Sequence, residues 1–279
     1  MSTGRNLRNK SIFITGGSRG IGLAVALRAA KDGARIAIAA KTAEPHPRLE
    51  GTIYTAADMI EAAGGKALPL ICDVRFEDQI EAAVAQTVKE FGGIDICINN
   101  ASAISRTGTL ETTSKRFDLM HQINTRGTFL VSKACIPHLM RAENPHILNM
   151  APPINLDEKR WSRSLAYIMA KTGMSLCVLG MSEEFRDEGI AVNAVWPRGA
   201  VATAAINNLL GGTEAMLRSK KPAMIAEASH IILTSPGREF TGRFCIDEDI
   251  LREAGIDDFS RWEVQPRDLN SRGHYIQTI

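Results

Sequence analysis

A glycine-rich turn near the N-terminus constrains the fold of this chain more than any other feature. A short apolar run, residues 11–14, leads into Thr15-Gly16-Gly17-Ser18-Arg19-Gly20-Ile21-Gly22, and an apolar-rich run follows to residue 30. Glycine tolerates unusual φ values and close backbone approach, and the first N–H groups of a following helix can bind an anion. The pattern therefore predicts a strand, a phosphate-binding turn and a helix that together hold a dinucleotide.

The rest of the chain alternates short β-branched runs with longer amphipathic ones. The predicted strands are residues 11–14, 34–39, 67–71, 94–98, 146–150, 190–195 and 243–246. The predicted helices are residues 21–30, 52–63, 76–91, 114–140, 162–186 and 222–233. Because the strands are almost continuously apolar, both faces of the sheet must be covered. We therefore expect an α/β fold, a Rossmann-type doubly wound parallel sheet of about seven strands with helices on both faces.

No linker or repeat divides the 279 residues, so we expect one domain, residues 1–279, with a core at about 9–247. Residues 248–279 form a C-terminal extension, most of which is polar and charged. Two alternatives remain open for residues 251–279. They are an ordered tail packed on the domain or on a neighbouring subunit, or a tail exposed to solvent.

Composition excludes several classes of function. The net charge is +2 and no basic tract is present, so we expect no nucleic acid partner. The five cysteines are dispersed and the histidines lack metal-ligand spacing, which predicts reduced thiols and no metal site. No apolar run approaches the roughly 18 residues that a membrane span needs, and residues 1–10 carry no secretory signal. The expected location is the cytoplasm, with no membrane partner.

The end of the second predicted strand carries a base where an NAD enzyme usually has an acid. That acid binds the ribose 2′-hydroxyl, but here the chain reads Ala40-Lys41-Thr42. Lys41, together with Arg19 of the glycine-rich turn, can neutralise a 2′-phosphate. The sequence therefore favours NADP(H) over NAD(H). The alternative is that both are solvated surface charges.

Two further polar positions follow predicted strands at the edge where the cofactor would lie. Asp73 follows the third strand and points toward the adenine crevice, or else caps the helix that begins near Phe76. Asn100 and Ala101 follow the fourth strand, where the amide can satisfy backbone groups and hold the adenine-ribose side of the pocket.

Tyr167 and Lys171 supply the chemistry that this pattern predicts. They are four residues apart on a predicted helix, so they share a face with roughly 5–6 Å between their Cβ atoms. Tyrosine normally titrates near 10, too high for acid–base work at neutral pH. A fixed positive charge lowers the pKa of a phenol, and we expect Lys171 to do so here.

These motifs resemble the short-chain dehydrogenase/reductase superfamily over residues 9–247. The resemblance rests on the glycine-rich turn, Asn99-Asn100-Ala101, Asn124 and the Tyr167/Lys171 pair. More narrowly, residues 40–47, 51–56 and 146–149, Pro152-Pro153 and Trp196-Pro197 look like its hydroxysteroid dehydrogenase-like branch. Members of that branch carry a lipid-transfer-like C-terminal domain, which we do not expect in this chain.

The resemblance implies roles for matching positions. Tyr167 would give or take the proton, Lys171 would also hold the nicotinamide ribose, and Asn124 would order a water that links Lys171 to solvent. Val201 or Ala200 would offer its backbone to the carboxamide, and Thr203 would offer a hydroxyl. The implied cofactor-binding residues are Gly16, Gly17, Ser18, Arg19, Gly20, Ile21, Gly22, Lys41, Asp73, Asn100, Ala101, Lys171 and Val201. The family also implies a homo-oligomer, a dimer or a tetramer, built through helices 114–140 and 162–186. Apolar Val178, Met181 and Phe185 suit that packing or simple core burial.

The part of the chain expected to bind substrate has two features: an apolar segment that could cover the pocket, and the absence of an expected serine. Residues 204–221 predict a mobile lid, and the expected pocket residues are Ala204, Ala205, Ile206, Leu209, Leu210, Met150 and Trp196. The family expects a serine after the fifth strand, but the chain reads Met150-Ala151-Pro152-Pro153. Ser164, Asn155 or a water could replace it. Two hypotheses follow: an NADP(H)-dependent oxidoreductase acting on a hydrophobic carbonyl or alcohol, or a non-catalytic NADP(H)-binding scaffold.

Overall fold

The computed structural model describes residues 5–47, 49–162, 164–209 and 211–265, which fold around one parallel sheet. Its seven strands lie in the order β3-β2-β1-β4-β5-β6-β7. The strands are β1 (Ser11–Thr15), β2 (Arg35–Ala40), β3 (Lys66–Ile71), β4 (Ile96–Asn99), β5 (His146–Asn149), β6 (Ala191–Trp196) and β7 (Phe244–Ile246). Every pairing is parallel. The order reverses beside β1, where β2 pairs on one side and β4 on the other. This switch point opens a crevice at the carboxyl ends of the strands.

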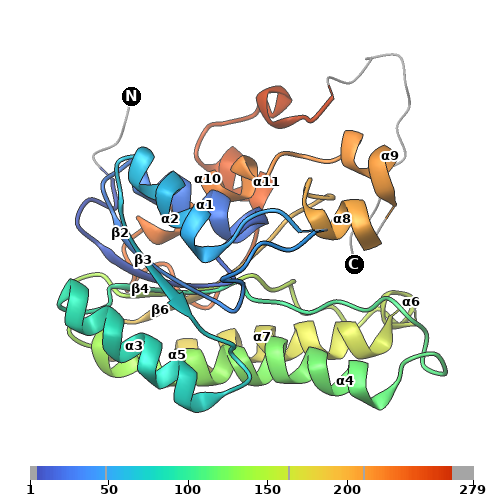
Figure 1. The fold of residues 1–279 in the computed structure, drawn as a ribbon, viewed down its shortest axis with the longest axis horizontal. Coiled ribbons are helices and arrows are strands. Elements are labelled where there is room, and N and C mark those ends of the chain that lie inside the picture. Colours follow the sequence, from blue (N-terminus) through green and yellow to red (C-terminus); the bar gives the residue numbers. More distant parts are fainter. Residues whose placement is uncertain (1–4, 48, 163, 210, 266–279) are drawn as a thin grey trace.

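Helices cover both faces of the sheet (Figure 1). One layer contains α1 (Gly20–Ala30), α2 (Ile53–Ala62), α10 (Ala223–Leu233) and α11 (Asp247–Glu253). The other contains α3 (Glu77–Phe91), α4 (Ser114–Met120), the π-helix η1 (His121–Arg126), α5 (Gly127–Leu139) and α7 (Leu165–Glu184). Three short helices, α6 (Glu158–Trp161), α8 (Ala204–Leu209) and α9 (Gly212–Leu217), lie in the connections. The predicted fold class is confirmed.

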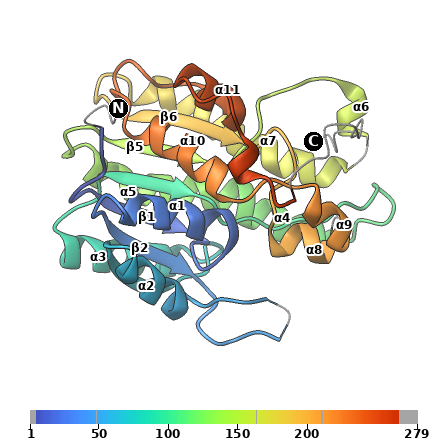
Figure 2. The same cartoon turned by 90° about the horizontal axis from the view of Figure 1, so that it is seen from above.

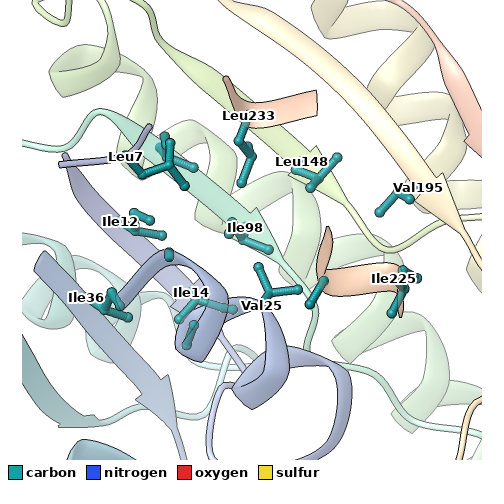
Figure 3. Packing of buried hydrophobic residues seen from close by; sticks show 14 of the residues in the cluster. Leu7, Ile12, Ile14, Val25, Ile36, Ile98, Leu148, Val195, Ile225 and Leu233 are labelled. Atoms are coloured by element: carbon teal, nitrogen blue, oxygen red, sulfur yellow. The ribbon is translucent and has the colours of Figure 1, made fainter. Parts of the chain in front are cut away.

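The strands alternate between two apolar clusters because successive side chains point to opposite faces of a sheet. Ile12 and Ile14 of β1 belong to the cluster that α1 and α10 complete, whereas Phe13 between them belongs to the cluster that α3, α5 and α7 complete. Figure 3 shows Ile12 and Ile14 in the first cluster with Val25 of α1 and Ile225 of α10. Burial on both faces explains why these strands read as continuous apolar runs.

Helix ends follow local signals in the sequence. Thr52 caps α2 through a capping box with Thr55, whose backbone N–H lies 3.1 Å from the Thr52 hydroxyl. Helix α3 ends at Gly92, which has a φ of 83°. The predicted boundaries agree with the observed ones within two residues for most elements.

The predicted helix 114–140 differs from the structure in its middle. Residues 121–126 form a π-helix between α4 and α5. There the N–H of Gly127 bonds to the carbonyl of Gln122, five residues back. Such insertions often lie at functional sites, and this one places Asn124 in the interior, with none of its surface exposed. Hydrophobic periodicity does not distinguish a π-turn from α-helix.

The expectation that no apolar run approaches the length of a membrane span is wrong by length and composition. Helix α7, 20 residues long, meets both criteria. It packs against η1, β5 and β6. A buried core helix passes the same test as a membrane span, and α7 buries Tyr167 and Lys171 against the domain.

The described part of the C-terminal extension packs on the domain. Leu251 of α11, Phe259 and Trp262 all join the cluster beneath α1 and α10. The N–H of Lys221 donates to the carbonyl of Trp262 at 2.6 Å. Of the two readings for residues 251–279, the ordered one applies up to residue 265, and residues 266–279 lie outside the described residues.

Candidate functional site

A cavity of about 1060 Å³ opens at the carboxyl ends of the strands and gathers most of the predicted site residues. Twelve of them line it: Gly16, Ser18, Arg19, Gly20, Ile21, Lys41, Asp73, Asn100, Ala101, Tyr167, Lys171 and Val201. Three others, Gly17, Gly22 and Asn124, do not line the cavity. Seen from above, the loop between β2 and α2 and the helices α8 and α9 lie on one side of the molecule (Figure 2), and residues of that loop and of α8 line the cavity.

The glycine-rich turn is held by Asn100 at the end of β4. The Asn100 amide donates to the carbonyls of Thr15 (3.0 Å) and Gly16 (2.9 Å). A Cβ atom at Gly22 would lie 2.4 Å from Nδ2 of Asn100, so no other residue fits there. Gly16 has a φ of 66°, which only glycine adopts without strain. Asn100 thus holds the turn through its backbone carbonyls, as we expected from the sequence for this amide.

Helix α1 begins at this turn without a side-chain cap. Its N-cap residue, Arg19, makes no capping hydrogen bond, and the first turn contains no acid. Gly20 and Ile21 of this first turn line the cavity together with Ser18, and the first N–H groups of a helix have no partner within it. This donor set has the chemistry of a site for the pyrophosphate of a dinucleotide.

Arg19 points to a different partner than the sequence predicts. Its Nε donates to the carbonyl of Glu50 (2.8 Å) and its Nη2 to the carbonyl of Gly51 (2.5 Å). Burial lowers the pKa of Arg19. Gly51 itself packs on the turn, since a Cβ there would meet the Ser18 carbonyl at 2.7 Å. Arg19 therefore fastens the loop after β2 to the glycine-rich turn, and Lys41 is the exposed cation at that end of the cavity.

Asp73 lines the cavity and also pairs with a base that the sequence reading missed. Its carboxylate accepts two hydrogen bonds from Nε of Arg75, both at 3.0 Å, and one from Nη2 at 2.6 Å. Burial raises the pKa of Asp73, but Arg75 and then Lys41 outweigh that effect and hold it below its usual value. Asp73 is not the cap of α3: that position belongs to Phe76, which makes no side-chain capping bond.

Tyr167 and Lys171 lie on one face of α7 and both line the cavity. The Nζ atom of Lys171 donates to the carbonyl of Met150 at 2.7 Å and lies 5.2 Å from the ring centre of Trp196. Burial lowers the pKa of Lys171 to about 7. Burial raises the pKa of Tyr167 well above its ordinary value, and the charge that opposes this rise is Arg106. The expectation that Lys171 lowers the Tyr167 pKa is wrong for this arrangement, because the amine is directed to Met150.

Asn124 fixes the loop that follows β4. Its Oδ1 accepts from the N–H of Ala103 (2.8 Å), and its Nδ2 donates to the carbonyl of the same residue (3.0 Å). The neighbouring Thr125 donates from its hydroxyl to the carbonyl of Ala170 in α7 at 2.9 Å. The π-helix thus ties the β4–α4 loop to the helix that carries Tyr167. The role that the family resemblance assigns to Asn124, ordering a water, stays a prediction.

The position of the expected serine offers no hydroxyl to the cavity. Ala151 is fully buried in the apolar cluster beneath α5 and α7. Asn155 accepts from the N–H of Asp157, Ser164 is the buried N-cap residue of α7, and neither lines the cavity. Among described residues 150–167, only Met150 and Tyr167 do. Two of the three proposed replacements are therefore wrong, and the described hydroxyl groups at the cavity, besides Tyr167, belong to Ser18, Thr42, Ser102 and Thr203.

The segment expected to form a mobile lid, residues 204–221, contains the helices α8 and α9. Helix α8 lines the cavity with Ala204, Ala205 and Ile206, as predicted, and also with Asn207 and Asn208. Ile206 packs against Ala200 and Ala215. Met150 and Trp196 also line the cavity, as predicted. The predicted pocket residues Leu209 (side chain) and Leu210 lie outside the described residues.

Helix α11 anchors the loop between β6 and α8 at a residue that the sequence reading missed. The buried carboxylate of Asp247 accepts the N–H groups of Arg198 (2.9 Å) and Glu248 (2.8 Å). Burial raises the pKa of Asp247 to about 6. Val201 follows in this loop, and its neighbour Ala202 donates to the carbonyl of Lys220 at 2.9 Å. From sequence, Asp247 looks like an ordinary acid in the first turn of a helix.

The chain is similar to known dehydrogenases along most of its length. A family model described as short chain dehydrogenase matches residues 10–211. Hydroxysteroid dehydrogenase-like protein 2 of Danio rerio is 58% identical over 265 residues, which is 95% of this chain and 63% of that protein. The protein of the same name from Homo sapiens is 56% identical over 276 residues, 99% of this chain and 64% of that protein. The chain therefore spans slightly less than two thirds of these curated relatives.

A crystal structure of a short chain dehydrogenase from Mycobacterium thermoresistibile superposes on this fold with a TM-score of 0.89. The two sequences are 56% identical, and the match covers 94% of this chain and 92% of that one.

Proposed function

The chain belongs to the short-chain dehydrogenase/reductase family, as its motifs predict, and on that premise we propose its reaction. We propose that it transfers hydride between NADP(H) and the carbonyl or alcohol of a small hydrophobic substrate, with Tyr167 giving or taking the proton. One observation carries the proposal: Tyr167 and Lys171 line the same cavity as the glycine-rich turn that begins α1. A residue that can donate a proton thus lies in the same cavity as a turn that is suited to the pyrophosphate of a dinucleotide.

The residues of the cavity fit a nicotinamide cofactor, the kind that this family uses. The uncapped start of α1 and the glycines with positive φ supply backbone donors and close approach for a pyrophosphate. Ala101, Asp73 and Val201 line the same cavity, where the first two would border the adenosine and the third the nicotinamide. When bound, the reduced nicotinamide supplies the hydride.

The preference for NADP(H) rests on charge at the end of β2. Lys41 is exposed and lines the cavity, and no acid follows β2 directly. The carboxylate that lines the described cavity, Asp73, is already paired with Arg75. A 2′-phosphate therefore meets one exposed ammonium there, whereas a 2′-hydroxyl finds no unpaired carboxylate.

The environment of Tyr167 suits a proton donor. Burial raises the pKa of Tyr167, so the phenol keeps its proton at neutral pH and can deliver it to a substrate oxygen as the carbonyl is reduced. Lys171 lies one helical turn further along, where its buried amine can donate to cofactor hydroxyl groups. Apolar Ile104, Ile206 and Trp196 surround the substrate space.

The test is NADPH consumption across a panel of hydrophobic ketones and the matching alcohol oxidations with NADP⁺. We expect turnover of at least one ketone class, and loss of turnover in Tyr167→Phe with NADPH binding retained. No turnover with any member of the panel, together with normal NADPH binding, would refute the enzyme and favour the second candidate.

That second candidate is a non-catalytic NADP(H)-binding scaffold. Ala151 favours it, because the serine expected after β5 is absent and no hydroxyl from that connection reaches the cavity. Loss of one oxyanion donor typically slows a reaction by about 10²–10³-fold. An enzyme without this serine must therefore place another donor at the substrate oxygen, and Ser102 of the β4–α4 loop borders the cavity.

We also propose a homo-oligomer, a dimer or tetramer, and a cytoplasmic location. Val178 and Met181 of α7 are core residues, and Phe185 packs against that core. Leu176 and Leu179 of the same helix are more than half exposed and suit a subunit contact. Light scattering, with Leu176→Lys as the disrupting change, tests the assembly. The five cysteines form no disulfide, which suits a reducing compartment, and cell fractionation tests the location.

A further inference from the structure

Arg106 is a cation at the substrate end of the cavity that the proposed reaction does not use. It lies in the loop between β4 and α4 and borders the same cavity as Tyr167, Ile104 and Ile206. Its side chain is exposed. Among the ion pairs and hydrogen bonds that the described residues form, none involves Arg106.

The other cations of this cavity are each accounted for. Arg19 donates to the carbonyls of the loop after β2, and Lys171 donates to the carbonyl of Met150. Lys41 lies at the adenosine end, where its charge acts on Asp73. Arg106 lines the same described cavity wall as Tyr167, and its charge lowers the pKa of the phenol against the effect of burial.

The backbone on both sides of Arg106 is fixed. Before it, Ala103 is held by both ends of the Asn124 side chain, at 2.8 and 3.0 Å. After it, the Thr107 hydroxyl lies 2.7 Å from that of Thr112 and 3.2 Å from that of buried Ser105. The backbone of the loop is therefore fixed, so binding a partner there requires ordering only the Arg106 side chain.

We propose that the substrate carries an anionic oxygen group, a carboxylate or a phosphate, and that Arg106 binds it while the apolar wall holds the rest of the molecule. This inference rests on the proposed function, whose substrate class it narrows from neutral hydrophobic ketones to amphiphilic ones such as oxo acids. Guanidinium binds carboxylate and phosphate through paired, charge-assisted hydrogen bonds. Ile104 and Ile206 beside it suit an alkyl chain. Arg106 is thus a specificity-determining residue.

The turnover experiment compares charged and uncharged forms of one substrate. NADPH oxidation is measured with oxodecanoates whose ketone lies next to the carboxylate or two or four carbons from it, each beside its methyl ester. Alkyl ketones that end in a phosphate form the second arm. We expect the wild type to prefer an acid or a phosphate over its neutral form by about tenfold or more in kcat/KM. The favoured arm identifies the anion.

Substitution then assigns the preference to Arg106. In Arg106→Gln, the ratio of charged to neutral kcat/KM should fall about tenfold or more, while Arg106→Lys should keep part of it. Arg116→Gln is the matched control, because Arg116 is also exposed, lies at the start of α4 and does not border the cavity. An equal wild-type rate for acid, phosphate and ester, or a ratio unchanged in Arg106→Gln, overturns the inference.

A binding measurement separates this inference from the reaction itself. Calorimetry with decanoate, decyl phosphate and decanol on the NADP⁺-loaded protein needs no turnover. The protein could bind an anion more tightly than decanol, with Arg106→Gln weakening that binding about tenfold, and yet be inactive on every ketone. That result would support the anion site and refute the oxidoreductase. Turnover of charged and neutral substrates at equal rates would support the oxidoreductase and refute the anion site.

Discussion

The Nζ atom of Lys171 lies 2.7 Å from the carbonyl oxygen of Met150, so the residue that directly follows β5 holds the amine that was expected to act on Tyr167. Both residues border the cavity, and the ring of Trp196 covers the same amine at 5.2 Å. Burial lowers the pKa of the Lys171 amine to about 7. Its protonation state is therefore open to change by whatever binds beside it.

Cofactor binding should make Lys171 take up a proton. At about pH 8 the amine is mostly neutral because its pKa is about 7. The phosphates of NADPH and its ribose hydroxyls favour the charged form and raise that pKa. Calorimetry in two buffers of different ionisation enthalpy should show uptake of close to one proton, lost in Lys171→Met and kept in Lys133→Met on the surface. Equal uptake in the wild type and Lys171→Met would contradict the assignment.

Lys41 should decide between the two nicotinamide cofactors. Lys41→Ala removes the exposed ammonium at the end of β2, and we expect KM for NADPH to rise about tenfold or more while KM for NADH changes little. A wild-type preference of tenfold for NADH would refute the proposed specificity. Lys115→Ala serves as the control, because Lys115 is an exposed lysine of α4.

Two glycines of α7 should respond oppositely to alanine. A Cβ at Gly173 would lie 2.3 Å from Oγ1 of Thr125, whereas nothing lies within 4 Å of one at Gly180. Gly173→Ala should lower the free energy of unfolding by about 1–3 kcal/mol and loosen the contact between η1 and α7. Gly180→Ala should raise it by up to about 1 kcal/mol, because alanine favours a helix interior. Chemical denaturation measures both, and equal effects would argue against the close packing of η1 on α7.

The buried carboxyl of Asp247 should make stability depend on pH. Its pKa in the folded protein is about 6, against an ordinary 3.8, so its contribution is complete below pH 4 and is lost as pH rises through 6. Asp247→Asn can keep both backbone hydrogen bonds without that loss. Between pH 4 and 7 the unfolding free energy of the variant should gain about 3 kcal/mol on the wild type. Asp58→Asn on exposed α2 should show no such gain, and parallel curves for Asp247→Asn would contradict the burial of a charged group.

The sequence was sufficient for the framework because the framework depends on local signals. Alternating apolar runs and the glycine-rich turn predict strands, helices and their layers, and the parallel sheet follows. The spacing of Tyr167 and Lys171 places both at the cavity. Each of these inferences needs only neighbours along the chain.

The directions of side chains were not predictable, because they depend on contacts between distant segments. Arg19 turns to carbonyls 31 and 32 residues away, and Lys171 reaches Met150 across 21 residues. Arg106 gave no signal at all, since a lone arginine in a polar loop reads as a surface charge. Only the fold places it beside Tyr167.

Tyr167 is the group proposed to move the proton, and the whole reaction depends on it. The most direct measurement is single-turnover oxidation of bound NADPH, followed by absorbance after mixing with the best ketone from the panel, in the wild type and in Tyr167→Phe. We predict a fall of at least about 10³-fold in the rate, with NADPH affinity and melting temperature retained, because phenylalanine fills the same space without a proton. A rate within tenfold of the wild type would show that the proton comes from another group and would contradict the proposed mechanism.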